Sequence, residues 1–234
     1  MNAFRNSRAL ALVVTASSLA AGAFGWVPHA NADLISIGLQ EAGVNGGAIT
    51  TETTGGGSAT LASVVYGTFT LNQSTAQDAA GIGLPSLLNS NSLNTSSTSA
   101  GVLHVFVTAQ GLTDPIGLTG LLSSFAVNSL TGSLTSVTEQ TFLNVGNTLY
   151  GTTTPLSSAA FSAIGTSSPP AVPETLASPF SVTEEYTITA AGTGNANLTI
   201  DLSADAVPEP TSLALLASEL VGLGWLGRRR RKAV

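Results

Sequence analysis

The chain has 234 residues, enough for one ordinary domain with short terminal segments. Only 9% of the residues are charged, the formal net charge is −6, and there is no cysteine. All seven basic residues lie near the ends, at Arg5, Arg8 and 228–232, so residues 9–227 contain no Lys or Arg. This distribution excludes nucleic-acid binding through a basic patch on the body. Without disulfides, the core has to be stabilised by packing alone.

Residues 1–32 have the pattern of a secretory signal peptide, which we expect to be helical. Two arginines precede an apolar run over 9–23, and Ala30 and Ala32 form an A-x-A cleavage site. The pattern predicts cleavage between Ala32 and Asp33. An uncleaved N-terminal anchor is the alternative.

Residues 33–206 form the predicted body, in which short alternating segments are separated by Gly-rich turns. The alternation is clearest within 60–71, where Val64, Tyr66 and Thr68 share one face of a strand. The expected strands cover residues 34–40, 48–53, 60–71, 101–110, 121–128, 134–142, 181–191 and 196–203.

The segments between these strands are expected to be irregular. Residues 77–99 read as a loop, and residues 144–168 read as irregular chain with a helical turn over 157–164. Four prolines between 169 and 179 indicate another loop. The last two strands are expected to form a hairpin around 192–195, because this segment reads Gly-Thr-Gly-Asn.

Short strands, frequent Gly and Thr, and no long helical period predict an all-β fold, an antiparallel β-sandwich. A partly closed barrel is the other candidate. In the full chain, we expect this body to be flanked by the N-terminal signal-peptide helix and by a C-terminal transmembrane helix.

The C-terminal segment, residues 207–234, has three parts in a fixed order. The first is a short polar motif of Val207, Pro208, Glu209 and Pro210. A mostly apolar run over 211–227 follows, which would span about 25 Å as a helix. The basic stop consists of Arg228, Arg229, Arg230, Arg231 and Lys232. By the positive-inside rule, the basic stop stays in the cytoplasm and the body lies outside the inner membrane.

This order resembles the C-terminal sorting signal of the PEP-CTERM family of Gram-negative bacteria. The resemblance implies that an exosortase, a membrane-embedded cysteine transpeptidase, recognises the Pro-Glu-Pro motif, cuts near it and passes the protein to the cell exterior. Glu219, in the middle of the apolar run, departs from the family pattern, in which this depth holds small and aliphatic residues. A permanent single-pass anchor is the alternative.

The sequence predicts no catalytic residue, metal ligand or cofactor. His104, the one histidine of the body, lies in a strand among Val and Phe residues, which is typical of a packed or half-exposed strand histidine. The neighbours Glu184 and Glu185 should point to opposite faces of a strand, which argues against a joint role. Asp201 and Asp205 share a face only if their strand stays extended there.

A four-residue sequence, Ser-Val-Thr-Glu, occurs twice in the body. It covers 136–139 and 181–184, a spacing of 45 residues. Because four residues in a Thr-rich β protein are weak support for a repeat, we interpret the two copies as independent edge-type strands.

These features predict an exported structural or interaction protein, not an enzyme, at the cell surface or in an exopolysaccharide matrix. Its partners would be the exosortase, the inner membrane before processing, and exopolysaccharide; nucleic acid is not among them. A carbohydrate- or calcium-binding module is the alternative, favoured by exposed aromatic side chains on one sheet face or by converging loop carboxylates. A secreted hydrolase would require His104 in a cleft beside an Asp and a Ser.

Overall fold

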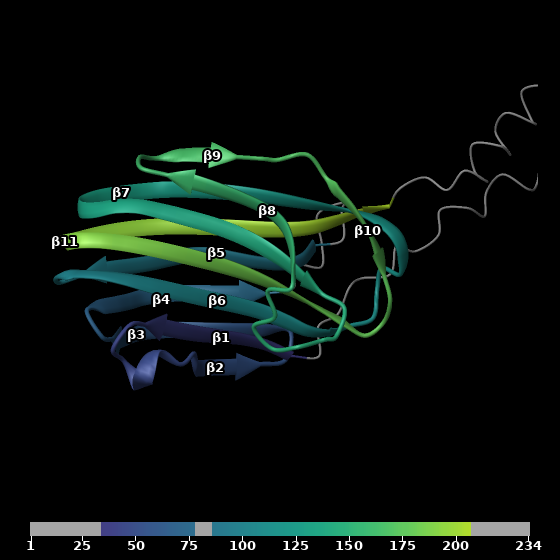
Figure 1. Ribbon diagram of the computed structural model, residues 1–234, viewed down its shortest axis with the longest axis horizontal. Coiled ribbons are helices and arrows are strands. Elements are labelled where there is room, and N and C mark those ends of the chain that lie inside the picture. Colours follow the sequence, from purple (N-terminus) through teal and green to yellow (C-terminus); the bar gives the residue numbers. More distant parts are fainter. Residues whose placement is uncertain (1–33, 78–85, 207–234) are drawn as a thin grey trace, which may run out of the picture.

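The computed structural model describes residues 34–77 and 86–206, and over these ranges the protein is nearly all β (Figure 1). Within these ranges, eleven strands join one antiparallel sheet, accompanied by a single 3-10 turn, η1 (Asn45–Gly47). The strands are β1 (Leu34–Glu41), β2 (Thr50–Gly55), β3 (Ser58–Tyr66), β4 (Phe69–Gln77), β5 (Ser86–Ser97), β6 (Ala100–Leu112), β7 (Gly117–Asn144), β8 (Thr154–Phe161), β9 (Gly165–Ser167), β10 (Val172–Leu176) and β11 (Phe180–Ala206). The predicted all-β class is confirmed.

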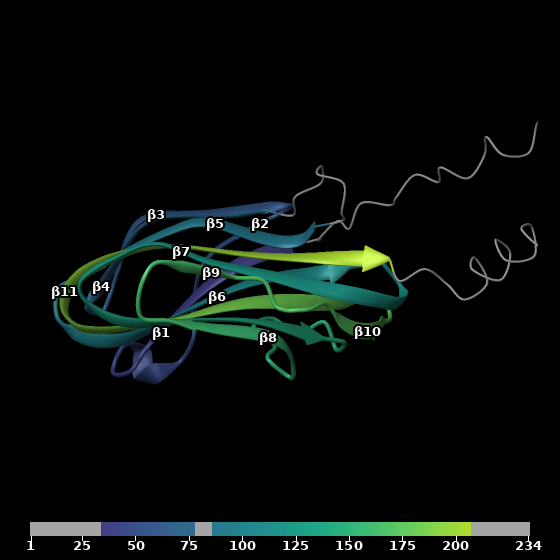
Figure 2. The same cartoon turned by 90° about the horizontal axis from the view of Figure 1, so that it is seen from above.

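Two very long strands, β7 and β11, organise the sheet. They pair with each other along nearly their whole length, from Ser181 opposite Asn144 to Ala206 opposite Thr119. On its other side, the first half of β11 pairs with β6 and the second half pairs with β5. Figure 2 shows the reason: β7 and β11 fold back on themselves, so that their two halves lie in opposite layers.

Glycines at the bend of each long strand allow the two strands to fold back. The backbone of Gly132 has a φ of 70°, and a Cβ there would lie 2.5 Å from the carbonyl oxygen of Thr193. A Cβ at Gly194 would lie 2.5 Å from the carbonyl oxygen of Thr131. The two backbones therefore approach more closely than side chains would permit.

The folded sheet is nearly closed into a barrel. The strand order runs β2-β1-β6-β11-β5-β4-β3, so β2 and β3 lie at opposite ends of the path. They are nevertheless consecutive in the chain, joined by the short turn between Gly55 and Ser58, which brings the two ends of the sheet together. The two layers thus belong to a single sheet, in contrast to a sandwich of two separate sheets.

The interior is filled by the alternating inward residues of both layers. The large side chains Phe69, Phe125, Phe180 and Tyr186 are fully buried there. Fully burying one such aromatic side chain contributes on the order of 1.5–3 kcal/mol. The core therefore forms without disulfides, as expected from the absence of cysteine.

Some predicted elements are wrong, and long-range pairing explains why. The hairpin predicted around 192–195 is instead the bend of β11, which continues because β7 pairs with both of its halves. The strand predicted over 60–71 is the β3–β4 hairpin, which turns at Gly67, where φ is 56°. The predicted loop over 77–99 contains β5, whose polar residues pair with β4 and β11.

The predicted irregular segment over 144–168 contains β8 and β9, and the predicted helical turn over 157–164 is absent. The Pro-rich segment contains β10. All three short strands add to β7, so their extended conformation depends on a partner that is distant in sequence.

The first and last described strands reach the same end of the barrel. Leu34 lies opposite Gln110 near the end of β6, and Ala206 lies opposite Thr119 near the start of β7. Only the short segment 113–116 separates β6 from β7. Within the described ranges, no helix is long and apolar enough to cross a membrane.

Candidate functional site

The most unusual chemical feature of the described residues is a pair of glutamates inside the barrel. Glu139 of β7 and Glu184 of β11 are both fully buried. Glu139 lies directly opposite Tyr186, and Glu184 lies directly opposite Thr141. Because directly opposite residues share a face of the sheet, all four side chains point inward, and the two carboxyl groups are diagonal neighbours.

Hydroxyl groups of both layers lie in the interior with this pair, and one of them bonds a carboxyl group. Ser90 of β5 donates a hydrogen bond to Glu184 Oε2 and lies 2.5 Å from the Tyr186 hydroxyl, Oγ to Oη. The Tyr186 hydroxyl also accepts a hydrogen bond from the backbone N–H of Ile200 at 2.9 Å. Thr141 bonds Ser123 across the interior, with 2.7 Å between their hydroxyl oxygens. The polar groups therefore link the two layers through the middle of an otherwise apolar core.

Three carboxyl oxygens of this cluster have no hydrogen-bond partner among the described residues. They are both oxygens of Glu139 and the Oε1 atom of Glu184. By contrast, the buried carboxylate of Glu41 accepts bonds from the Thr68 backbone N–H at 3.0 Å and from its hydroxyl at 2.7 Å. The lack of partners is thus specific to the inner pair and not a general property of buried carboxyl groups in this fold.

Burial dominates the electrostatics of the cluster. Desolvation raises the pKa of Glu139 to about 8. Desolvation also raises the pKa of Glu184 well above its usual value, helped by the nearby Asp201 and Glu139 charges and opposed by the Ser90 hydrogen bond. The pKa of Tyr186 is raised by burial and by the charge of Glu184. Because the body contains no Lys or Arg, no basic side chain can compensate these charges.

The sequence contained a signal for this cluster. Glu139 and Glu184 are the last residues of the two Ser-Val-Thr-Glu copies, which lie in neighbouring strands and place both carboxyl groups on the inner face. Their interpretation as edge-type strands is wrong, since β7 pairs here with β8 and β11, and β11 pairs with β6 and β7. The prediction that Glu184 and Glu185 point to different faces of the strand is confirmed. Glu184 is inside the barrel, whereas Glu185 faces outward.

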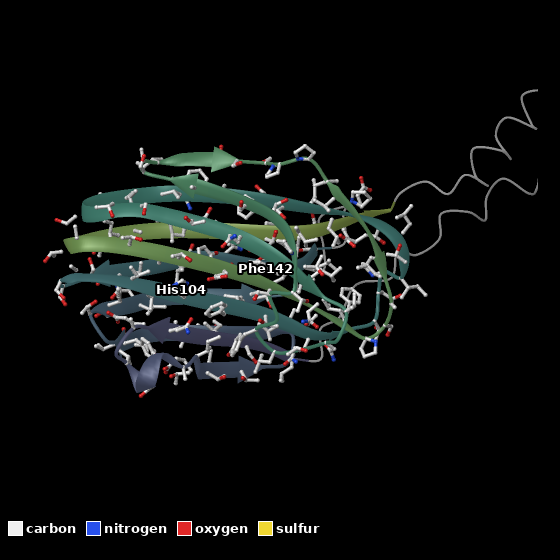
Figure 3. All side chains as sticks on the ribbon, viewed as in Figure 1. His104 and Phe142 are labelled. Carbon is white, nitrogen blue, oxygen red and sulfur yellow. The ribbon has the colours of Figure 1, made fainter. Side chains whose placement is uncertain are left out.

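His104 lies on the outer face of the sheet. Its Nδ1 atom is 2.9 Å from Glu185 Oε1 and 3.2 Å from the Thr187 hydroxyl oxygen, and its ring stacks on Phe106 with 6.2 Å between centroids. Figure 3 shows His104 and Phe142 on the same face of the front layer. The hydrogen-bond partners of His104 are thus a glutamate and a threonine, and no Asp–Ser pair completes a triad with it among the described residues.

The carboxylates and aromatic side chains that would favour a calcium- or carbohydrate-binding site do not converge in the described part of the chain. Asp201 and Asp205 lie on a strand that stays extended, but Asp201 accepts bonds from Asn89 at 3.0 Å and Ser86 at 3.4 Å, while Asp205 is exposed. No group of three or more His, Asp or Glu side chains suited to a metal ion occurs there. The large hydrophobic side chains exposed on the described surface are all aliphatic, so they form no aromatic platform for a sugar.

The residues of the predicted signals lie outside the described ranges. This applies to the signal cleavage residues, to the Pro-Glu-Pro motif with its apolar run, and to the basic stop. These residues are Ala30, Ala32, Asp33, Val207, Pro208, Glu209, Pro210, Arg228, Arg229, Arg230, Arg231 and Lys232.

Compared with known proteins, the chain matches no family model and no curated protein.

Proposed function

We propose that this chain is an exported, non-enzymatic surface or matrix protein with an all-β body, sorted and processed through its C-terminal Pro-Glu-Pro signal by an exosortase. The observation that supports this proposal is the composite tail, in which the motif at 207–210 is followed by the apolar run at 211–227 and the basic stop at 228–232. A three-residue motif recurs by chance, but the ordered combination of all three parts is far more specific.

The boundaries of the body are compatible with processing at both ends. The first described strand begins at Leu34, next to the expected cleavage after Ala32, and the last ends at Ala206, directly before Val207. Cleavage at either place would remove no residue of any described strand.

The composition of the body suits a passive role outside the cell. A body of residues 33–206 retains eleven acidic residues, the thirteen of the chain less Glu209 and Glu219, and no basic side chain. An anionic surface of this kind resists nonspecific binding to acidic polymers. Contact with an acidic exopolysaccharide would therefore depend on bridging divalent cations or on neutral hydroxyl and amide groups.

The intact mass of the protein, recovered from its own host in membrane and released fractions, tests the sorting proposal. We expect a chain that starts at Asp33 and ends near 208–210. A mass that runs through to Val234 and is confined to membranes would contradict the proposal and indicate a permanent single-pass anchor.

A matched pair of variants tests the role of the motif. Glu209→Gln removes the only charge of the motif, and we expect unprocessed chain to accumulate in the membrane fraction. Glu174→Gln is the control, because residues 171–174 repeat the sequence Ala-Val-Pro-Glu but lie within the body, partly in β10. Processing of Glu209→Gln to the same extent as Glu174→Gln would contradict a role for the Glu209 charge in recognition.

A further inference from the structure

The inner carboxyl groups lack a partner of opposite charge, and the body contains no Lys or Arg that could be one. Glu139 and Glu184 are fully buried, and three of their four carboxyl oxygens have no hydrogen-bond partner among the described residues. Leaving buried polar oxygens unpaired destabilises a folded protein, because each loses its hydrogen bonds to water without gaining a new one. With no Lys or Arg between residues 9 and 227, only a proton or a cation from solution can neutralise the pair.

The polar side chains beside the pair carry only oxygen atoms as possible ligands. Tyr186 lies directly opposite Glu139, Thr141 lies directly opposite Glu184, and Ser90 reaches both Glu184 and Tyr186 from the other layer. There is no cysteine in the chain, and the one body histidine is on the outer face. Hard cations prefer such all-oxygen surroundings, whereas zinc and copper prefer nitrogen and sulfur.

We propose that the barrel interior binds one Ca²⁺ ion between the carboxylates of Glu139 and Glu184, with hydroxyl oxygens of Ser90, Tyr186 and Thr141 as further ligands. Two carboxylates balance the charge of one divalent cation and give all three unpartnered oxygens a partner. Ca²⁺ fits better than Mg²⁺, because Ca²⁺ accepts irregular coordination and sheds its water readily, whereas Mg²⁺ demands near-octahedral geometry and retains several waters.

The ion would act as a structural clamp. Glu139 and Glu184 come from the front layer and Ser90 from the other layer, so a shared ion joins the three strands β5, β7 and β11 through the core. Since the site is fully buried, the ion has to enter as the chain folds. This inference is independent of the sorting proposal, which concerns only the terminal segments.

The test is to refold the full-length chain in detergent, with either EDTA or CaCl₂, at pH 7.5. With Ca²⁺, native mass spectrometry should show one ion per chain, and the melting temperature should be higher than in EDTA by roughly 5–10 °C at a saturating concentration. Glu139→Gln and Glu184→Gln should each lose the ion and the thermal shift, because each removes one anionic ligand and leaves a side chain of nearly the same shape.

Glu185→Gln is the matched control, since this carboxylate is adjacent to Glu184 in the same strand but faces outward. It should retain both the ion and the thermal shift. A wild-type chain that refolds without bound calcium and melts at the same temperature in EDTA and CaCl₂ would overturn the proposal. So would calcium binding that persists in both inner variants, because the ion would then be held by surface carboxylates.

Discussion

At the scale of single residues, the inner glutamates differ from the other carboxyl groups of the body. Glu41 is buried with two hydrogen bonds from Thr68, and Glu185 contacts His104 on the outer face. Glu139 has neither a partner nor exposed surface. In the absence of a bound cation, its neutral form is the one that the folded protein accommodates, so its protonation is coupled to folding.

The pH dependence of stability follows from this coupling. In EDTA, the folded protein holds a proton on Glu139 up to a pKa of about 8, whereas the unfolded chain releases it near 4.5. Stability should therefore be highest in mild acid and fall by about 1.4 kcal/mol per pH unit for this group between these two values. The raised pKa of Glu184 acts in the same direction.

Glu139→Gln should flatten this dependence and make the protein more stable than wild type at pH 8, as measured by urea unfolding in EDTA at several pH values. Asp205→Asn, which changes an exposed carboxylate, should leave the slope unchanged. A Glu139→Gln variant with the wild-type slope would show that this carboxyl group is ionised in the folded protein.

At the scale of elements, the bend of β7 and β11 determines the architecture. Gly192 and Gly194 both lie in the bend of β11, but their surroundings differ. A Cβ at Gly194 would meet a backbone oxygen at 2.5 Å and a backbone nitrogen at 2.9 Å, and a backbone cannot move aside like a flexible side chain. At Gly192, the nearest atoms belong to the small side chain of Ser133, at 3.3 Å.

Gly194→Ala should therefore destabilise the protein by about 1–3 kcal/mol, because it forces apart two paired strands. Gly192→Ala should change stability by less than about 1 kcal/mol. Chemical unfolding of both variants measures the difference, and equal effects would mean that the close approach at Gly194 does not constrain the bend.

At the scale of the whole molecule, the body is stabilised without any lysine or arginine. Among the described residues, the one ion pair is His104–Glu185, which forms only when the histidine is protonated. The remaining ionised carboxylates repel one another, and dissolved salt screens this repulsion.

The melting temperature should accordingly rise as NaCl is increased at pH 7.5, the opposite of what surface salt bridges would give. At pH 4, where most exposed carboxyl groups are near or below their usual pKa, the effect should shrink. A melting temperature that falls with NaCl at pH 7.5 would indicate a favourable charge arrangement outside the described residues.

The sequence by itself determined the features that depend on composition and local pattern. Alternating β-branched residues predicted β1 and β6, and the absence of Lys and Arg from the body excluded a basic binding surface. The period of two also placed Glu184 and Glu185 on opposite faces, since this depends only on an extended backbone. The interpretation of residues 1–32 as a signal peptide and of residues 207–234 as a sorting signal likewise depends on the sequence alone.

Only the tertiary structure decided which segments pair and what lies inside the barrel. Polar residues 86–97 form a strand because β4 and β11 satisfy their backbone groups. The Gly-rich segment 192–195 is a bend within one long strand and not the turn of a hairpin, because β7 continues beside it. Glu139 and Glu184 are 45 positions apart in the chain. They become neighbours through the register of β7 on β11, which is set by pairing over long range and not by any local preference.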